Sequence, residues 1–327
     1  MNLFSAVAGL LKPAPPPDPK LAEALARVAS RVDPVLRAAH HFDHRLSAPL
    51  AHTLGYCAGL VDALPGPITI DRQAFSGDPL VHALFATAGD IEEMLGRSQA
   101  VRDFLETPES WQEEHFHALL VARHREKQQL GMKRRGELIE NDVPQRVLFF
   151  SDHTLIAPRS EPEDLREQLR GMALESLLRS FQTHLDALRH ERDGLRADAS
   201  VKRTHLGVLN GAPGRDIETR TRHLDELDAR LRQIAESLMP DPLLDALGDF
   251  LLKPESALRL TPFSISVDRL GIIRDPADDA SVQTLNFPEF MSRDQRLHLA
   301  MLVRISRAEA IEAVEAMRDR QRRFMII

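Results

Sequence analysis

Histidine is the residue type in this chain most suited to metal chemistry, with fourteen copies. His40 and His44 are four residues apart, and Glu114 and His117 are three apart, so each pair would share one face of a helix. Glu-x-x-His is how helical bundles present ligands to paired iron or manganese ions. Such a site needs several inward carboxylates, and this motif occurs once, although Asp43, Glu113 and His124 could contribute. We therefore expect solvated or core-edge histidines, and a metal-dependent enzyme is the alternative function.

A second cluster is basic and lies between residues 123 and 135. Its members are Arg123, His124, Arg125, Lys127, Lys133, Arg134 and Arg135. Such a stripe can follow a phosphate backbone. However, Glu126, Glu137 and Glu140 interleave with it, no aromatic residue accompanies it, and the whole chain carries a formal net charge of -7. We expect a solvated helix end that does not bind nucleic acid, and nucleic-acid binding is the second alternative.

The usual sequence motifs of catalysis are missing. The chain has no glycine-rich phosphate loop, no nucleophile elbow, no cysteine pair and no dinucleotide fingerprint. We therefore predict neither catalytic nor cofactor-binding residues. The leading hypothesis is a non-enzymatic interaction, assembly or adaptor protein, with a protein as its partner.

The strongest pattern runs from Ser160 to Pro240 and predicts an antiparallel coiled-coil helical hairpin. Ser160 and Glu163 have the spacing of a capping box around Pro162. Apolar residues then recur at alternating steps of four and three, first in Leu174, Leu178, Phe181, Leu185, Leu188, Leu195 and Ala199, and again in Ile217, Leu224, Leu227, Leu231, Ile234 and Leu238. The glycine-rich and proline-containing segment 207–214 separates the two runs and predicts a chain reversal.

One register aligns both helices of this hairpin. Leu195 faces Leu227, Ala199 faces Leu224 and Leu206 faces Ile217, because residue numbers that face each other must have a nearly constant sum. Arg192 then occupies a seam position opposite Leu231. A charge in such a seam lowers stability but can fix the alignment of the helices. The predicted interaction residues on the hairpin are Arg192, Leu195 and Leu227.

The predicted fold class is α+β and predominantly α, with a small antiparallel sheet made from two strand groups. We predict an amphipathic segment and proline-rich tether (1–19), a helical domain (20–131), an α+β domain (132–159 and 253–327), the coiled-coil hairpin as an insertion (160–240) and a short connecting helix (241–252). Within these segments, Trp111 to Leu130 predicts a helix with Phe116, Leu119 and Leu120 facing inward.

Changes in hydrophobic period locate the strands. Arg146–Phe150 and Thr154–Ala157 predict a short hairpin around a turn at Ser151–His153, with Glu137–Ile139 as a possible third strand. Leu258–Val267, Ile272–Ile273 and Val282–Phe287 predict the second group. A capping box at Ser292–Gln295 predicts a C-terminal helix that includes Leu297, Met301, Ile305 and Ile311 and ends in the basic segment 318–323.

Both ends of the chain carry apolar residues. Phe4 and Leu11 lie on one face of a short amphipathic helix that could dock on the body, on a partner or weakly on a membrane surface, and no membrane span is expected. The apolar end at Ile327 could return to the body or bind a partner. The single Cys57 indicates a reducing compartment, and 36 arginines against six lysines suggest a GC-rich bacterial genome. We therefore expect a bacterial cytoplasmic protein.

Overall fold

A computed structural model describes residues 19–135, 138–208, 214–268, 271–275, 282–291 and 296–324. The predicted N-terminal segment with Phe4 and Leu11, most of the hairpin loop, the predicted capping box at 292–295 and Ile327 lie outside these residues. No helix among the described residues is both long enough and apolar enough to cross a membrane.

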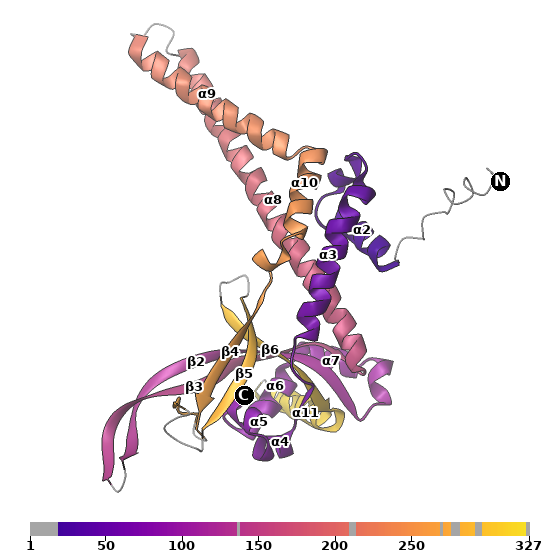
Figure 1. Cartoon of the computed structure of the whole chain (residues 1–327), viewed down its shortest axis with the longest axis vertical. Helices are drawn as coiled ribbons and strands as arrows, with labels where there is room; N and C mark the ends of the chain where they lie inside the picture. The colour runs from indigo at the N-terminus through magenta and orange to yellow at the C-terminus, as the bar shows by residue number, and fades with distance from the viewer. Residues whose placement is uncertain are drawn as a thin grey trace, which may run out of the picture. The chain divides into compact units, whose positions relative to one another are not determined.

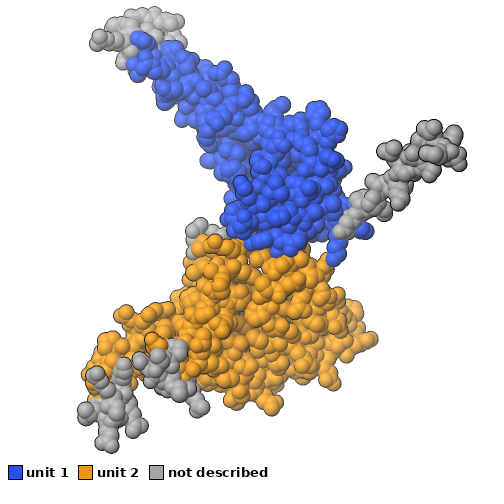
Figure 2. Space-filling model, in the orientation of Figure 1, with its two compact units in different colours: residues 1–56, 174–257 blue, residues 57–173, 258–327 orange. Residues whose placement is uncertain are grey.

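The chain divides into two compact units, which Figure 2 colours separately. Unit 1 comprises residues 1–56 and 174–257, and unit 2 comprises residues 57–173 and 258–327. The predicted domain boundaries differ from this division and remain a prediction, because compactness does not show which segment folds by itself.

Helices dominate the chain, as the sequence predicts (Figure 1). The longer ones are α2 (Pro19–Arg31), α3 (Phe42–Asp62), α6 (Ala88–Arg97), α8 (Pro162–Val208), α9 (Gly214–Ser237), α10 (Pro240–Leu251) and α11 (Arg307–Phe324). The short ones are η1 (Pro34–Ala38), α4 (Arg72–Gly77), α5 (Pro79–Leu84), α7 (Gln99–Leu105), η2 (Pro108–Trp111) and η3 (Pro254–Ser256). Asp33, Asp71 and Asp78 each accept a backbone amide hydrogen bond at the start of a short helix, as capping residues do.

A six-stranded sheet lies in unit 2. Its strands are β1 (Ile68–Ile70), β2 (His115–Arg135), β3 (Leu138–Arg159), β4 (Leu260–Val267), β5 (Gln283–Met291) and β6 (Leu297–Ser306). The order is β3-β2-β6-β5-β4 with antiparallel neighbours, and β1 pairs with β6 in parallel. The two strand groups therefore form one sheet, and the predicted predominantly α, α+β fold class is confirmed.

Helices cover both faces of this sheet. On one face, the helices α5, α6, α7 and α11 pack against alternate strand residues in the largest core cluster (Figure 1). On the other face, Val61 of α3 and Leu165 of α8 pack against Leu302 of β6. The centre of β6 is consequently buried on both sides, from Leu299 to Val303.

Unit 1 is a helical body held by apolar and polar contacts between its helices. Phe181 of α8 packs against Phe250 of α10, with ring centroids 5.4 Å apart. Thr53 of α3 donates a hydrogen bond from Oγ1 to the Leu251 carbonyl at 2.6 Å. Arg189 of α8 pairs with Asp33, whose side chain is nearly buried. These contacts join the N-terminal helices to α8 and α10.

The predicted helix from Trp111 to Leu130 is wrong. Only Pro108–Trp111 forms a 3-10 turn, and His115 onward is strand β2. Phe116, Ala118, Leu120 and Ala122 alternate onto one buried face. A short apolar run fits either period, and here pairing with β3 and β6 on both sides selects the strand.

The predicted C-terminal helix begins later than expected. Leu297–Ser306 is the central strand β6, and the helix α11 starts at Arg307. Because both faces of β6 are covered, its sequence lacks the alternation of a half-exposed strand and reads as a continuous apolar run. That run also satisfies a helical period, so the sequence alone predicts a helix through Leu297, Met301 and Ile305.

The predicted turn at Ser151–His153 is also wrong. β3 continues through these residues, and the register with β2 shifts between Val121 and Arg123. Asp152 has φ of 58°, a left-handed conformation that aspartate tolerates better than most residues. The irregularity is therefore a bulge inside one long hairpin. Leu138 and Ile139 of the possible third strand belong to β3, and Glu137 lies outside the described residues.

Candidate interaction site

The predicted metal ligands have other partners in the structure. His40 contacts Asp241 through Nδ1 at 2.8 Å, and this contact, together with Arg45, lowers the pKa of the Asp241 carboxyl group to about 2. His44 is an exposed residue of α3. Both histidines belong to unit 1.

Glu114, His117 and His124 belong to unit 2, and none of them is on a helix. His117 contacts the Ser160 carbonyl through Nδ1 at 2.9 Å, and His124 contacts Glu289 at 2.5 Å. The expected helical presentation of Glu114 and His117 is wrong because this segment is strand β2. Among the described residues, no group of three or more histidine, cysteine, aspartate or glutamate side chains could hold a metal ion.

The helical hairpin brings two of the predicted interaction residues together. Leu195 of α8 and Leu227 of α9 pack in one apolar cluster, whose other members are Ala199, Leu224 and Leu231. This cluster contains two of the pairs that the constant-sum register predicts. Leu206 and Ile217, the third pair, lie outside the described side chains.

Ion pairs connect the two helices along the sides of this apolar cluster. Arg230 of α9 donates from Nε to Glu191 of α8 at 2.8 Å, and Arg203 of α8 pairs with Asp228 of α9 at 2.5 Å. Because these side chains are 37–57% exposed, each pair adds little to stability. Their charges instead give the hairpin a surface of mixed sign.

Arg192 is partly buried beside this cluster, with 27% of its side chain exposed. Its Nε donates to Asp193 at 2.9 Å, and this bond lowers the pKa of the Asp193 carboxyl group. The guanidinium therefore satisfies one donor with its own neighbour in the sequence. The predicted position of Arg192 on the hairpin is thus compatible with a charge that opposes tight packing.

We predict that Arg192→Leu raises the unfolding free energy of the full chain by about 1 kcal/mol, and with it the thermal midpoint. The reason is that an apolar side chain removes the cost of a partly buried charge. Arg196→Leu is the matched control, since Arg196 is on the same helix but 62% exposed and should change the midpoint little. Thermal unfolding followed by circular dichroism at 222 nm checks both. A lower midpoint for Arg192→Leu would show that the arginine stabilises the seam.

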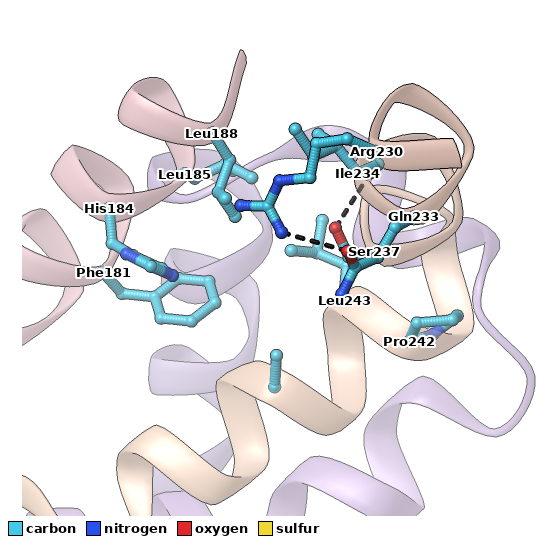
Figure 3. Close-up of a pocket in the computed structure, with 11 residues that line it drawn as sticks. Phe181, His184, Leu185, Leu188, Arg230, Gln233, Ile234, Ser237, Pro242 and Leu243 are labelled. Atoms are coloured by element: carbon cyan, nitrogen blue, oxygen red, sulfur yellow. Dashed lines mark hydrogen bonds between the residues drawn. The ribbon is translucent and has the colours of Figure 1, made fainter. Parts of the chain in front are cut away.

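An apolar pocket lies where α8, α9 and α10 meet in unit 1 (Figure 3). Its floor is buried and apolar, formed by Phe181, Leu185, Ile234 and Leu243. Leu188 is half-buried at its edge. The pocket volume is about 240 Å³, below the roughly 300–1,000 Å³ of common small-molecule sites. Its size and lining suit a single apolar side chain.

Arg230 provides the polar rim of this pocket. Figure 3 shows its guanidinium extending from α9 toward α8, above the apolar floor. It donates to Gln233 at 3.0 Å as well as to Glu191. These bonds fix a positive charge at the edge of the pocket.

The sequence identified the seam but not this pocket. The seam depends on a local period, whereas the pocket requires α10 to fold back against both helices after Pro240. The only sequence signal was the apolar side of α10, which includes Leu243 and Leu247 and shows that this short helix must pack against something.

The chain was compared with protein-family models, curated proteins and solved structures, and no match was found.

Proposed function

We propose that this chain is a non-enzymatic interaction or assembly protein of the bacterial cytoplasm, and that it acts through the α8–α9 hairpin as a coiled-coil finger. The partner is a protein that docks along the hairpin and inserts one apolar side chain into the pocket at its base. The observation that carries the proposal is how little of the distal hairpin is buried.

Among the described side chains from residue 190 to residue 232, only Ala199, Leu224 and Leu227 are buried. They pack with Leu195 and Leu231 of the same hairpin. This part of α8 and α9 therefore supports its own fold and leaves most of its surface to solvent. A long hairpin with these properties is well suited to reach a partner.

The pocket supports the same proposal through its chemistry. A protein side chain can use an apolar floor with a charged rim, because the floor takes the apolar group and the rim orients the partner backbone or an acidic neighbour. Small buried anchors of this kind contribute a large share of binding energy at protein interfaces.

Excision of residues 196–226 and closure with a short Asn-Gly turn tests the proposal. We expect the shortened chain to fold, because the removed helical segments pack on each other. In addition, the entropic cost of closing a loop changes little with its length. Circular dichroism should fall only by the helix removed. Aggregation or loss of the body's unfolding transition would show that the hairpin is a core element.

Partner recovery is measured with the same variants. Equal amounts of immobilised full chain, excised chain, Leu188→Arg and Ala197→Arg are exposed to lysate, and retained proteins are identified by mass spectrometry. Leu188 borders the pocket, whereas Ala197 is an exposed residue of α8 outside the pocket lining, so the two substitutions add the same charge to one helix.

The proposal expects at least one protein to be retained by the full chain and by Ala197→Arg, and lost from both the excised chain and Leu188→Arg. Retention by all four would overturn a role for the hairpin. Loss from the excised chain alone would keep the hairpin and reject the pocket as an anchor.

A further inference from the structure

A ribbon formed by β2 and β3, here called the arm, extends from the sheet of unit 2 (Figure 1). Near its base, residues 271–273 bond to the outer edge of β3 at residues 146–148, and beyond that point the ribbon is two-stranded. β2 pairs with β6 only from His115 to Ala122, and from Arg123 to Arg135 it pairs with β3. Residues 123–151 contain seven lysines and arginines against four acidic residues, a net charge of +3 in a chain whose formal net charge is -7. Positive charge is thus concentrated on the arm.

Strand alternation sorts these charges by face. Arg123, Arg125 and Lys127 are two residues apart on β2 and therefore share one face of the arm, which we call the basic face. Arg123 and Arg125 both reach Asp152, at 3.2 and 3.4 Å, which agrees with a shared face. Lys127 is exposed.

The acidic residue that interrupts the sequence run belongs to the opposite face. Glu126 pairs there with Arg146, whose Nε donates at 2.9 Å, and both lie on the side of the arm whose base carries the buried Leu148 and Phe150. Glu126 therefore does not interrupt the basic face, on which Asp152 is the acidic residue that pairs with Arg123 and Arg125.

Apolar side chains are exposed on the same arm. Phe149 lies opposite Arg125 on the basic face and is 39% exposed. Farther along β2, Leu130 and Met132 are each 68% exposed, although strand alternation puts Leu130 on the face of Glu126. Proteins that bind DNA with strands combine phosphate contacts from basic side chains with apolar groups that touch or wedge between bases.

We propose that the basic face of the arm binds duplex DNA, with Arg123, Arg125 and Lys127 on the phosphates. The major groove of B-DNA admits a two-stranded ribbon, whereas the major groove of duplex RNA is too narrow for side chains to read. A single strand would need several stacking aromatics, and among its described side chains the basic face offers only Phe149. The acidic remainder of the chain restricts contact to the arm.

Fluorescence anisotropy of a labelled DNA duplex of about two helical turns, titrated with the full chain, tests this inference. If three phosphates are neutralised, affinity should fall roughly 40-fold from about 50 to 200 mM salt. Duplex RNA of the same sequence and single-stranded DNA should bind more weakly.

Two charge reversals distinguish binding by the basic face from a general effect of net charge. Lys127→Glu should weaken binding to duplex DNA at least about fivefold at low salt, because it replaces a phosphate contact by repulsion. Arg146→Glu changes the net charge equally but on the opposite face, and should leave affinity within about twofold. Circular dichroism of both variants verifies that the sheet is retained.

Equal weakening by the two substitutions would overturn the assignment to this face. Tighter binding of RNA or of single-stranded DNA would overturn duplex DNA as the ligand, and no salt-dependent binding would overturn the inference altogether. The excised chain without residues 196–226 should bind DNA like the full chain, so the result is independent of the hairpin's proposed role.

Discussion

Phe116→Ala is expected to lower the unfolding free energy of unit 2 by about 3–5 kcal/mol. Phe116 is 1% exposed and packs in the core between β2 and the covering helices, with its ring centroid 5.2 Å from that of Phe104. Truncation removes apolar contacts and leaves a cavity that the close-packed neighbours can fill only in part. Chemical denaturation followed by circular dichroism measures the loss.

Phe149→Ala is the matched control for this substitution. Phe149 is on the neighbouring strand β3 but is 39% exposed, so the same truncation should cost about 1 kcal/mol. Similar losses for the two variants would contradict the burial that the structure assigns to Phe116.

Local spacing around Phe116 does not distinguish a helix from a strand. The pair Phe116 and Leu120 is four residues apart, a spacing that is compatible with both a helical face and an even-numbered strand face. Distant strands decide between them, because β6 supplies one partner edge and β3 the other. Information of that kind is absent from a local window.

The helical hairpin was predictable for the opposite reason. Its two helices repeat one period over many turns, and the helices that pair are adjacent in sequence, so the facing of Leu195 and Leu227 follows from numbering alone. The start of α8 at Pro162 was also as expected. The Ser160 side chain nevertheless bonds elsewhere, donating its hydroxyl to the Glu109 carbonyl at 3.1 Å.

The basic face of the arm was predictable in part. Its residues are evident in the sequence, but a helix would keep Arg123 and Lys127 on one face and turn Arg125 to the opposite side. Only the strand assignment places the three on one face and brings Phe149 opposite Arg125. A change of period therefore changes the chemistry of the surface, with the same residues.

Gly66→Ala should destabilise unit 2 by about 3 kcal/mol or more, through strain and overpacking together. Gly66 has φ of +105°, a region that is costly for any residue with a side chain. A Cβ at this position would lie 2.2 Å from the carbonyl oxygen of Leu302 and 3.0 Å from the amide nitrogen of Ile68. Both are backbone atoms and cannot rotate away.

The clash with the Leu302 carbonyl would disturb the central strand of the sheet. Leu302 is in the middle of β6, and its amide donates to the Pro65 carbonyl at 2.8 Å. The segment before β1 is thus bonded to the central strand, and displacing it to make room for a methyl group would disturb the pairing of β1 with β6. Gly66 therefore determines how closely the chain approaches the sheet.

Gly59→Ala is the control, since Gly59 is an exposed residue of α3 and an added Cβ would meet nothing within 4 Å. There the substitution should stabilise by roughly 0.5–1 kcal/mol, because alanine loses less backbone freedom in a helix. Denaturant midpoints of the two variants should consequently move in opposite directions. A Gly66→Ala midpoint at or above that of the unsubstituted chain would mean that the segment from Pro65 to Ile68 does not approach β6 as closely as the structure places it.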